Sequence, residues 1–127
     1  MQLLGTHHIA IFTRNFAELE RFYTETLGFP VTKRWDDSGI IFIDIGSTTI
    51  ELIGRKDEGT DKPIGRGEGV GLNHVALHVA SVDEAFAELQ EKQVNILSGP
   101  ANFQDVRIAF FADPDGNVLE LVENVGS

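Results

Sequence analysis

A histidine-bearing strand pattern occurs twice in this chain, and the repeat limits the fold more than any other feature. Residues 6–12 read THHIAIF and residues 72–79 read LNHVALHV. Aligning His8 with His74 also brings the helical pattern after each strand into step. A period of about 65–70 residues is too long for a solenoid unit. The sequence therefore predicts a small α/β module that has been duplicated.

Each half of the chain also carries one glutamate inside an apolar strand pattern. These segments read TIELI at 49–53 and VLELV at 118–122, which places the glutamates at Glu51 and Glu120. They follow the aligned histidines by 43 and 46 residues. The similar spacing supports two copies of one design, in which a histidine strand is followed by a helix and three more strands.

Periodicity and turn residues predict the elements of both modules. In the first module we expect strands over 6–12, 29–35, 40–45 and 48–53, and a helix over 15–27 that Asn15 caps and Gly28 ends. In the second we expect strands over 74–79, 94–97, 106–112 and 118–123, a loop over 99–104, and a helix over 82–92 with Ser81 and Glu84 as a capping box.

The length of 127 residues is that of one domain, and 42% apolar residues are enough to build its core. Within a single domain over 1–127 we place module 1 at 1–55, a linker at 56–70 and module 2 at 71–127. The segment 56–70 is charged and rich in glycine, so it cannot bury much apolar surface. It is interpreted as an inter-module linker, with a mobile lid as the alternative.

Composition excludes several classes of partner. Twenty acidic against ten basic residues give a net charge of −10, which disfavours nucleic acid and anionic membranes. No apolar run approaches the roughly 18 residues that cross a bilayer, and no signal-peptide pattern opens the chain. The chain has no cysteine, so a metal would need nitrogen and oxygen ligands. We expect a soluble cytoplasmic protein that binds a small molecule.

His8, Glu51, His74 and Glu120 are predicted to point to one face of their strands, because side chains alternate along a strand. The opposite face of each strand is aliphatic. A lone strand histidine is usually structural and a lone glutamate is usually solvated, but burying four such groups unpaired is costly. The duplicated pairing therefore predicts one divalent metal ion, with two positions open for water or substrate. Nickel, zinc, cobalt, manganese and iron all remain candidates.

Two further histidines lie near these positions. His7 is predicted to face the helix side if His8 faces the metal. His78 shares the face of His74, but four residues of strand separate them by ~13 Å, too far to bind one ion. His78 is interpreted as a substrate-pocket or a structural histidine.

The chain resembles the vicinal oxygen chelate superfamily, which includes glyoxalase I, methylmalonyl-CoA epimerase, extradiol dioxygenases, fosfomycin-resistance thiol transferases and bleomycin-binding proteins. The resemblance is carried by HIAI at 8–11, FY at 22–23, LGF at 27–29, NHVAL at 73–77 and DPDGNVLEL at 113–121. It implies an α+β fold of two βαβββ modules that form a cupped mixed sheet around a metal site, often in a homodimer. Its metal positions match His8, Glu51, His74 and Glu120.

A ligand set of two histidines and two glutamates most resembles that of glyoxalase I. The resemblance implies a metal-dependent lyase or isomerase, in which Glu120 removes a proton next to a carbonyl, Glu51 serves the opposite side, and the metal stabilises the enediolate. Methylmalonyl-CoA epimerase would use similar chemistry. The alternatives are a dioxygenase with His8, His74 and Glu120 as ligands, a thiol transferase, or a non-catalytic small-molecule (antibiotic) binding protein.

The expected substrate pocket differs from that of glutathione-using relatives. Those resemble this chain but carry arginine four residues after the first histidine and asparagine four after the first glutamate, where Phe12 and Arg55 stand here. The thiol of any thiol-adduct substrate therefore stays open. The residues expected to line a pocket for an anionic or aromatic substrate are Phe12, Arg55, His78, Phe103 and Arg107, together with Arg34, Trp35 and Phe110.

Overall fold

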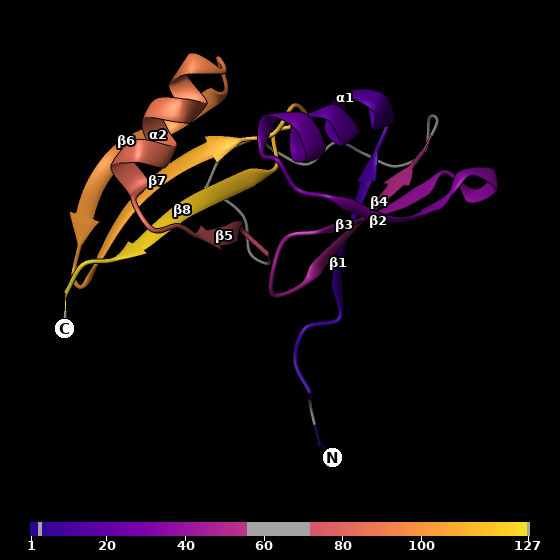
Figure 1. Cartoon of the computed structure of the whole chain (residues 1–127), viewed down its shortest axis with the longest axis horizontal. Coiled ribbons are helices and arrows are strands. Elements are labelled where there is room, and N and C mark those ends of the chain that lie inside the picture. The colour runs from indigo at the N-terminus through magenta and orange to yellow at the C-terminus, as the bar shows by residue number, and fades with distance from the viewer. Residues whose placement is uncertain (3, 56–71, 127) are drawn as a thin grey trace. The chain divides into compact units, whose positions relative to one another are not determined.

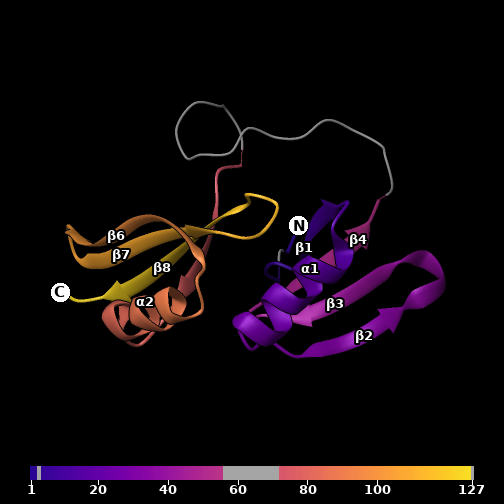
Figure 2. The ribbon, with the colours of Figure 1, turned by 90° about the horizontal axis from the view of Figure 1, so that it is seen from above.

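The structure is a computed structural model of the chain, and it describes residues 1–2, 4–55 and 72–126. The chain forms two compact units, Met1–Thr60 and Asp61–Ser127. Each unit contains one four-stranded mixed sheet with helical segments on one side (Figures 1 and 2). The predicted α+β class and the two βαβββ modules are confirmed.

The first unit builds its sheet in the order β1-β4-β3-β2. Strand β1 runs parallel to β4, and the other neighbours are antiparallel. The elements of this unit are β1 (His8–Thr13), α1 (Phe16–Arg21), η1 (Phe22–Thr26), β2 (Val31–Trp35), η2 (Asp36–Ser38), β3 (Ile40–Asp44) and β4 (Thr49–Gly54).

The second unit repeats this topology, with the order β5-β8-β7-β6 and the parallel pair β5 and β8. Its elements are β5 (Val75–His78), α2 (Val82–Glu91), β6 (Asn95–Phe103), β7 (Val106–Ala112) and β8 (Val118–Asn124). The first and last strands of each module therefore lie side by side. This pairing brings the histidine and the glutamate of a module together, although they are more than 40 residues apart in sequence.

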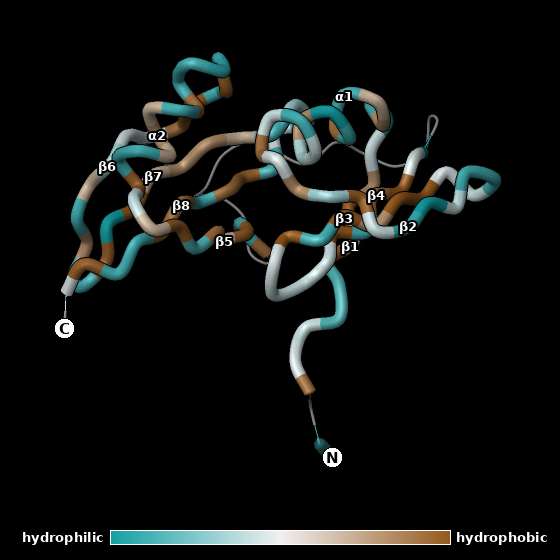
Figure 3. The backbone as a smooth tube through the Cα atoms, viewed as in Figure 1, coloured by the Kyte–Doolittle hydropathy of each residue, from teal (hydrophilic) through white to brown (hydrophobic). Residues whose placement is uncertain are grey.

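The core of each unit lies on the helix-facing side of its sheet, as the alternating pattern predicts. On β4, Ile50 and Leu52 are buried while Glu51 between them is half-buried. On β8, Leu119 and Leu121 flank Glu120 in the same way. Figure 3 shows the resulting alternation of hydrophobic and hydrophilic positions along the strands. One face of each sheet is thereby left for polar residues.

The helix predicted over 15–27 divides into two geometries. Segment η1 is a π-helix, in which the Leu27 amide donates to the Phe22 carbonyl at 2.9 Å. The neighbours Phe22 and Tyr23 are both buried, and their rings meet edge to face at 5.3 Å. Asn15 occupies the N-cap position without a side-chain capping bond, and Gly28 ends the segment with φ +83°. The widened turn lets two consecutive aromatic side chains enter the core.

The loop predicted over 99–104 is wrong, because β6 continues from Asn95 to Phe103. The pairing with β7 is irregular between Ile96 and Ala101, where Gly99 and Pro100 stand. An edge strand can contain these residues at a bulge. Proline lacks a backbone N–H, but on the side of the strand that has no neighbour this loses no hydrogen bond of the sheet. The Ser81 cap is confirmed, since its hydroxyl accepts from the Glu84 amide at 3.1 Å.

The linker predicted over 56–70 lies outside the described residues, so the division of the chain into modules and linker stays a prediction. None of the described helices is both long and apolar enough to span a membrane.

Candidate functional site

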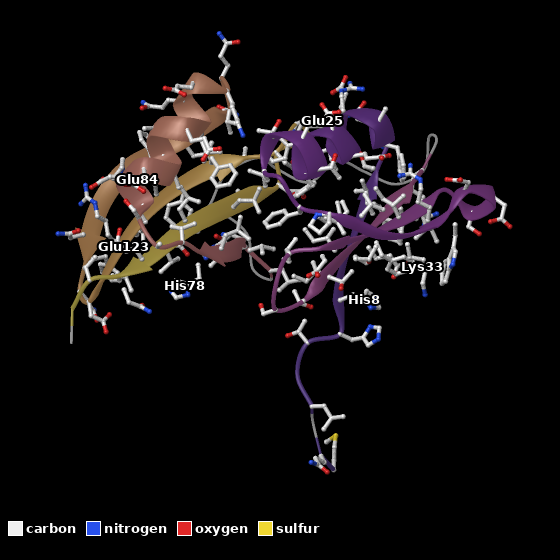
Figure 4. The ribbon with its side chains drawn as sticks, viewed as in Figure 1. His8, Glu25, Lys33, His78, Glu84 and Glu123 are labelled. Carbon is white, nitrogen blue, oxygen red and sulfur yellow. The ribbon has the colours of Figure 1, made fainter. Side chains whose placement is uncertain are left out.

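His8 and Glu51 meet on the polar face of the first unit's sheet. The parallel register of β1 and β4 places Ala10 opposite Glu51. His8 stands two residues before Ala10 and therefore shares its face of β1. Its Nε2 lies 3.2 Å from Glu51 Oε2, with 38% of the histidine and 17% of the glutamate side chain exposed. In Figure 4 the labelled His8 lies on the side of the sheet away from α1.

His74 and Glu120 form the same arrangement in the second unit. Ala76 stands opposite Glu120 in the register of β5 and β8. The Nε2 of His74 lies 3.1 Å from Glu120 Oε1, and the two side chains are 31% and 13% exposed. His74 itself precedes β5, although the sequence predicts it as the first strand residue. The structure thus brings the predicted ligands together as two matching pairs.

An aromatic ring adjoins each glutamate on the other side. Phe42 of β3 pairs in register with Glu51, and Phe110 of β7 pairs with Glu120. The ring of Phe110 meets the His74 ring edge to face at 5.4 Å. Alanine on one neighbouring strand and phenylalanine on the other therefore surround each carboxylate with apolar groups. This setting strengthens electrostatic interactions of the carboxylates, because little solvent screens them.

The residue before each histidine contacts its second ring nitrogen. His8 Nδ1 lies 2.9 Å from His7 Nδ1, and His74 Nδ1 lies 2.8 Å from Asn73 Oδ1. The prediction that His7 faces the helix side rests on strand alternation. Strand β1 begins at His8, so the alternation of strand side chains does not extend to His7.

These contacts determine what His74 presents to Glu120. With the Asn73 amide oxygen facing the ring, this contact is a hydrogen bond in the tautomer that carries the proton on His74 Nδ1. In a neutral ring the Nε2 lone pair then faces the carboxylate of Glu120. Two acceptors 3.1 Å apart repel each other unless a positive charge lies between them. A proton held between the two atoms, or a metal cation, removes that repulsion.

The donor atoms of each pair fit one divalent ion. Metal–nitrogen and metal–oxygen bonds of about 2.0–2.2 Å at a right angle place two donors about 3 Å apart. The observed separations are 3.2 and 3.1 Å. Among the described residues, no group of three or more histidine, aspartate or glutamate side chains is gathered as a metal site. Each unit thus holds one nitrogen and one oxygen donor close together.

Phe12 and Arg55 lie together on the first unit. The guanidinium of Arg55 is 4.2 Å from the centre of the Phe12 ring, and Phe12 is 58% exposed. Phe12 pairs with Ile53, which is the next residue after Glu51 on the same face of β4. These two predicted pocket residues therefore lie near a predicted metal ligand.

The pocket residues predicted in the second unit are distributed over both faces. His78 is exposed and shares the face of Glu120, where it pairs with Val122. Phe103, also exposed, stands at the far end of β6. Arg107 does not join them: its Nη2 lies 2.9 Å from Asp83 Oδ1 of α2, on the helix-facing side. The structure brings Arg107 to the helix and not to Glu120.

Arg34 likewise forms an ion pair with a helix residue. Its guanidinium donates to both carboxylate oxygens of Glu20 on α1, at 2.8 and 2.9 Å, and lies 3.4 Å from Asp36. The hydrogen bonds from Arg34 hold the pKa of Glu20 below its usual value, against the opposing effect of burial. The same pair raises the pKa of Arg34.

Sequence reasoning missed Phe42, and it assigned no role to Asn73. The cross-strand pairing that places Phe42 beside Glu51 is not visible in a sequence. Asn73 carried a usable signal, because it precedes His74 as His7 precedes His8.

Comparison with known proteins gives a family match over most of the chain. Residues 5–121 match the family model described as Glyoxalase/Bleomycin resistance protein/Dioxygenase superfamily. Among relatives, YwkD of Bacillus subtilis (strain 168) is 36% identical, covering 97% of this chain and 99% of its own. A lactoylglutathione lyase of Escherichia coli O157:H7 is 29% identical over 80% of this chain and 79% of its own.

A solved structure supports the fold. The crystal structure of a glyoxalase/dioxygenase from Nostoc punctiforme superposes with a TM-score of 0.80 at 21% identity, covering 95% of this chain and 91% of that chain. At this identity the likeness concerns the fold alone. The family match and the repeated βαβββ topology therefore agree.

Proposed function

Because the chain belongs to the glyoxalase/bleomycin resistance protein/dioxygenase superfamily, we propose that it is a metal-dependent lyase or isomerase that removes a proton next to a carbonyl group of a small molecule. Its proposed metal ligands are His8, Glu51, His74 and Glu120. The homodimer expected from the family resemblance and a cytoplasmic location are part of the same proposal.

The observation that carries the proposal is the matched pairing of imidazole nitrogen and carboxylate oxygen. The same contact occurs in both units, at 3.2 and 3.1 Å, and in both the other ring nitrogen is engaged by the preceding residue. A histidine that binds a metal commonly has its second nitrogen held in this way. Oxygen and nitrogen donors suit nickel, zinc, cobalt, manganese or iron.

Glu120 is the proposed base. Its side chain is 13% exposed and adjoins Ala76 and Phe110, so few water molecules compete for its carboxylate. A carboxylate in reach of a carbon-bound proton acts as a general base once the product carbanion is stabilised. A divalent ion held by His8, Glu51, His74 and Glu120 would supply that stabilisation as a Lewis acid. Glu51, set in an equivalent environment, would exchange protons on the opposite side of the substrate.

The equivalence of the two glutamates favours this reaction over the alternatives. A dioxygenase with His8, His74 and Glu120 as ligands leaves Glu51 without a role. Glu51 nevertheless contacts its histidine as Glu120 does. An isomerisation uses both, since one proton is removed and one is returned.

Elemental analysis of the untagged protein tests the metal. We expect about one divalent ion per chain in the wild type and its loss in a His74→Ala, Glu120→Ala double variant. His78→Ala and Glu123→Gln are matched controls, because each lies close in sequence to one of the two replaced residues but outside the proposed ligand set. Absence of metal from the wild type, with none taken up after incubation, would overturn the enzyme proposal.

Turnover is tested with metal-loaded protein. Hemithioacetals of methylglyoxal with several thiols are offered in deuterated water, and NMR follows deuterium incorporation at the carbon next to the carbonyl. Incorporation that depends on both metal and Glu120 supports proton abstraction. Consumption of oxygen with a catechol in place of this exchange would identify a dioxygenase instead.

A further inference from the structure

We propose that the polar face of the first unit's sheet binds a flat organic anion, an aromatic or conjugated carboxylate, through Lys33, Trp35 and Phe42, called here the Lys33 cluster. That this anion is the substrate rests on the proposed function. The binding itself requires no metal.

The Lys33 cluster combines one cation with two aromatic rings. The rings of Trp35 and Phe42 meet edge to face at 5.0 Å. The Lys33 ammonium lies 5.1 Å from the Trp35 ring centre and 5.4 Å from that of Phe42. Trp35 is 46% exposed. A flat ligand can contact these rings while its carboxylate pairs with the ammonium.

Lys33 has no carboxylate partner among the described residues, whereas its neighbour Arg34 is fully engaged by Glu20 on the other side of the sheet. Figure 4 shows the labelled Lys33 on the side away from α1, as it does His8. The chain carries a net charge of −10, so an organic anion is repelled from most of its surface. An unneutralised ammonium beside exposed rings is therefore the kind of place where such a ligand is accepted.

A second cation lies over a second exposed ring on the same face. Arg55 is 4.2 Å from the ring of Phe12, which is 58% exposed. Phe12 and Trp35 stand at opposite ends of one cross-strand row, with Ile53 and Ile40 between them. Large apolar side chains gathered on an exposed face are typical of binding sites. The row thus offers aromatic contact along the width of the sheet.

The strand register indicates how long a ligand would be that reaches from Lys33 to Glu51. Lys33, Phe42 and Glu51 occupy consecutive strands of one row. Adjacent strands are about 4.8 Å apart, so the backbones at Lys33 and Glu51 are about 10 Å apart. A ring over Phe42 fits between them. One end of such a ligand would lie at the proposed metal ligands and its anionic end at Lys33.

The Lys33 cluster is not part of what the two units share. When the two sheets are aligned by their strand pairing, Ser98 stands where Lys33 does. Likewise, Ala101 corresponds to Trp35 and His78 to Phe12. The histidine, the glutamate and the adjoining phenylalanine are repeated, but the positions of Lys33 and Trp35 hold the small residues Ser98 and Ala101 in the second unit. A contribution to sheet stability alone would not require this difference. The asymmetry points to an organic ligand held by the first unit.

Binding of trans-cinnamate to metal-free full-length protein tests the proposal, with cinnamamide as the neutral analogue and propionate as the non-aromatic one. NMR titration gives the dissociation constants. We expect saturable binding of cinnamate, at least about fivefold tighter than cinnamamide or propionate. Lys33→Met should remove the preference over cinnamamide and Lys33→Arg should retain it. The control is Lys92→Met, at the exposed C-cap of α2 in the second unit, which should leave the preference unchanged.

Equal affinity for cinnamate and cinnamamide in the wild type, or no saturable binding at millimolar concentration, would overturn the site. An unchanged preference in Lys33→Met would do the same. Because metal is absent from these titrations, their result is separate from that of the metal analysis. Cinnamate binding with no metal uptake would retain the site and reject the enzyme, whereas metal uptake without cinnamate binding would do the reverse.

Discussion

The imidazole of His74 lies between two oxygen atoms: its Nε2 is 3.1 Å from Glu120 and its Nδ1 is 2.8 Å from the amide oxygen of Asn73. The Asn73 contact favours the tautomer with the proton on Nδ1 and orients the ring. His7 occupies the corresponding position beside His8. Both proposed histidine ligands thus have a polar neighbour in the chain that can orient them.

Asn73 is expected to support metal affinity without being a ligand. Replacing it with alanine should weaken metal binding by about 10–100-fold, as loss of such outer contacts typically does. Asn73→His, which installs the residue present in the first unit, should restore most of the affinity. Competition with a chromophoric chelator measures both. Equal affinity of Asn73→Ala and wild type would show that the contact does not orient the ligand.

Glu120 should be required for proton removal. With the proton acceptor lost in Glu120→Gln, we expect deuterium exchange to slow by at least about 100-fold. The control is Glu123→Gln on the same strand, whose side chain faces the other way and accepts from the Val82 amide at 2.8 Å. Metal content is measured in both variants, so that loss of the base is distinguished from loss of the ion. A metal-loaded Glu120→Gln protein with the wild-type rate would exclude Glu120 as the base.

Leu52 tests the assignment of the helix-facing core. Its side chain is fully buried, so Leu52→Ala should lower the free energy of unfolding by about 2–5 kcal/mol. Leu4→Ala removes the same atoms from a side chain that is 90% exposed and should cost less than about 0.5 kcal/mol. Chemical denaturation followed by circular dichroism gives both values. Similar losses in the two variants would contradict the placement of the core.

Residues whose roles depend on local alternation could be predicted from the sequence. The polar face of Glu51 between Ile50 and Leu52 follows from the period of a strand, and the Ser81 cap follows from its spacing to Glu84. The pairing of each histidine with its glutamate was accessible because the module occurs twice. Repetition supplied the long-range information that a single copy lacks.

Features that depend on neighbours across strands could not be predicted. Arg107 was expected in a pocket, but its partner Asp83 lies on a helix 24 residues away. Lys33 and Phe42 became visible only through the register of β2 and β3. The strand through Gly99 and Pro100 was missed because local turn signals dominate there, while the position of β6 at the sheet edge allows a bulge.

The contact between Arg34 and Glu20 should make stability depend on pH in the acid range. Because Arg34 lowers the pKa of Glu20 in the folded protein, the pair stabilises the fold above the unfolded carboxyl pKa of about 4.3. That stabilisation is lost as the pH falls through the lower folded value. Arg34→Met should therefore be less stable than wild type at neutral pH, and the difference should shrink below about pH 4.

Lys33→Met is the matched control for this prediction. It removes one positive charge from the adjacent residue, which faces the other side of the sheet and has no carboxylate partner among the described residues. Any general effect of a more negative net charge appears in both variants. Urea denaturation at several pH values gives the difference between them. If Arg34→Met and Lys33→Met lose the same stability at neutral pH, or if the gap persists in strong acid, the fold does not depend on the ionised Glu20 carboxylate.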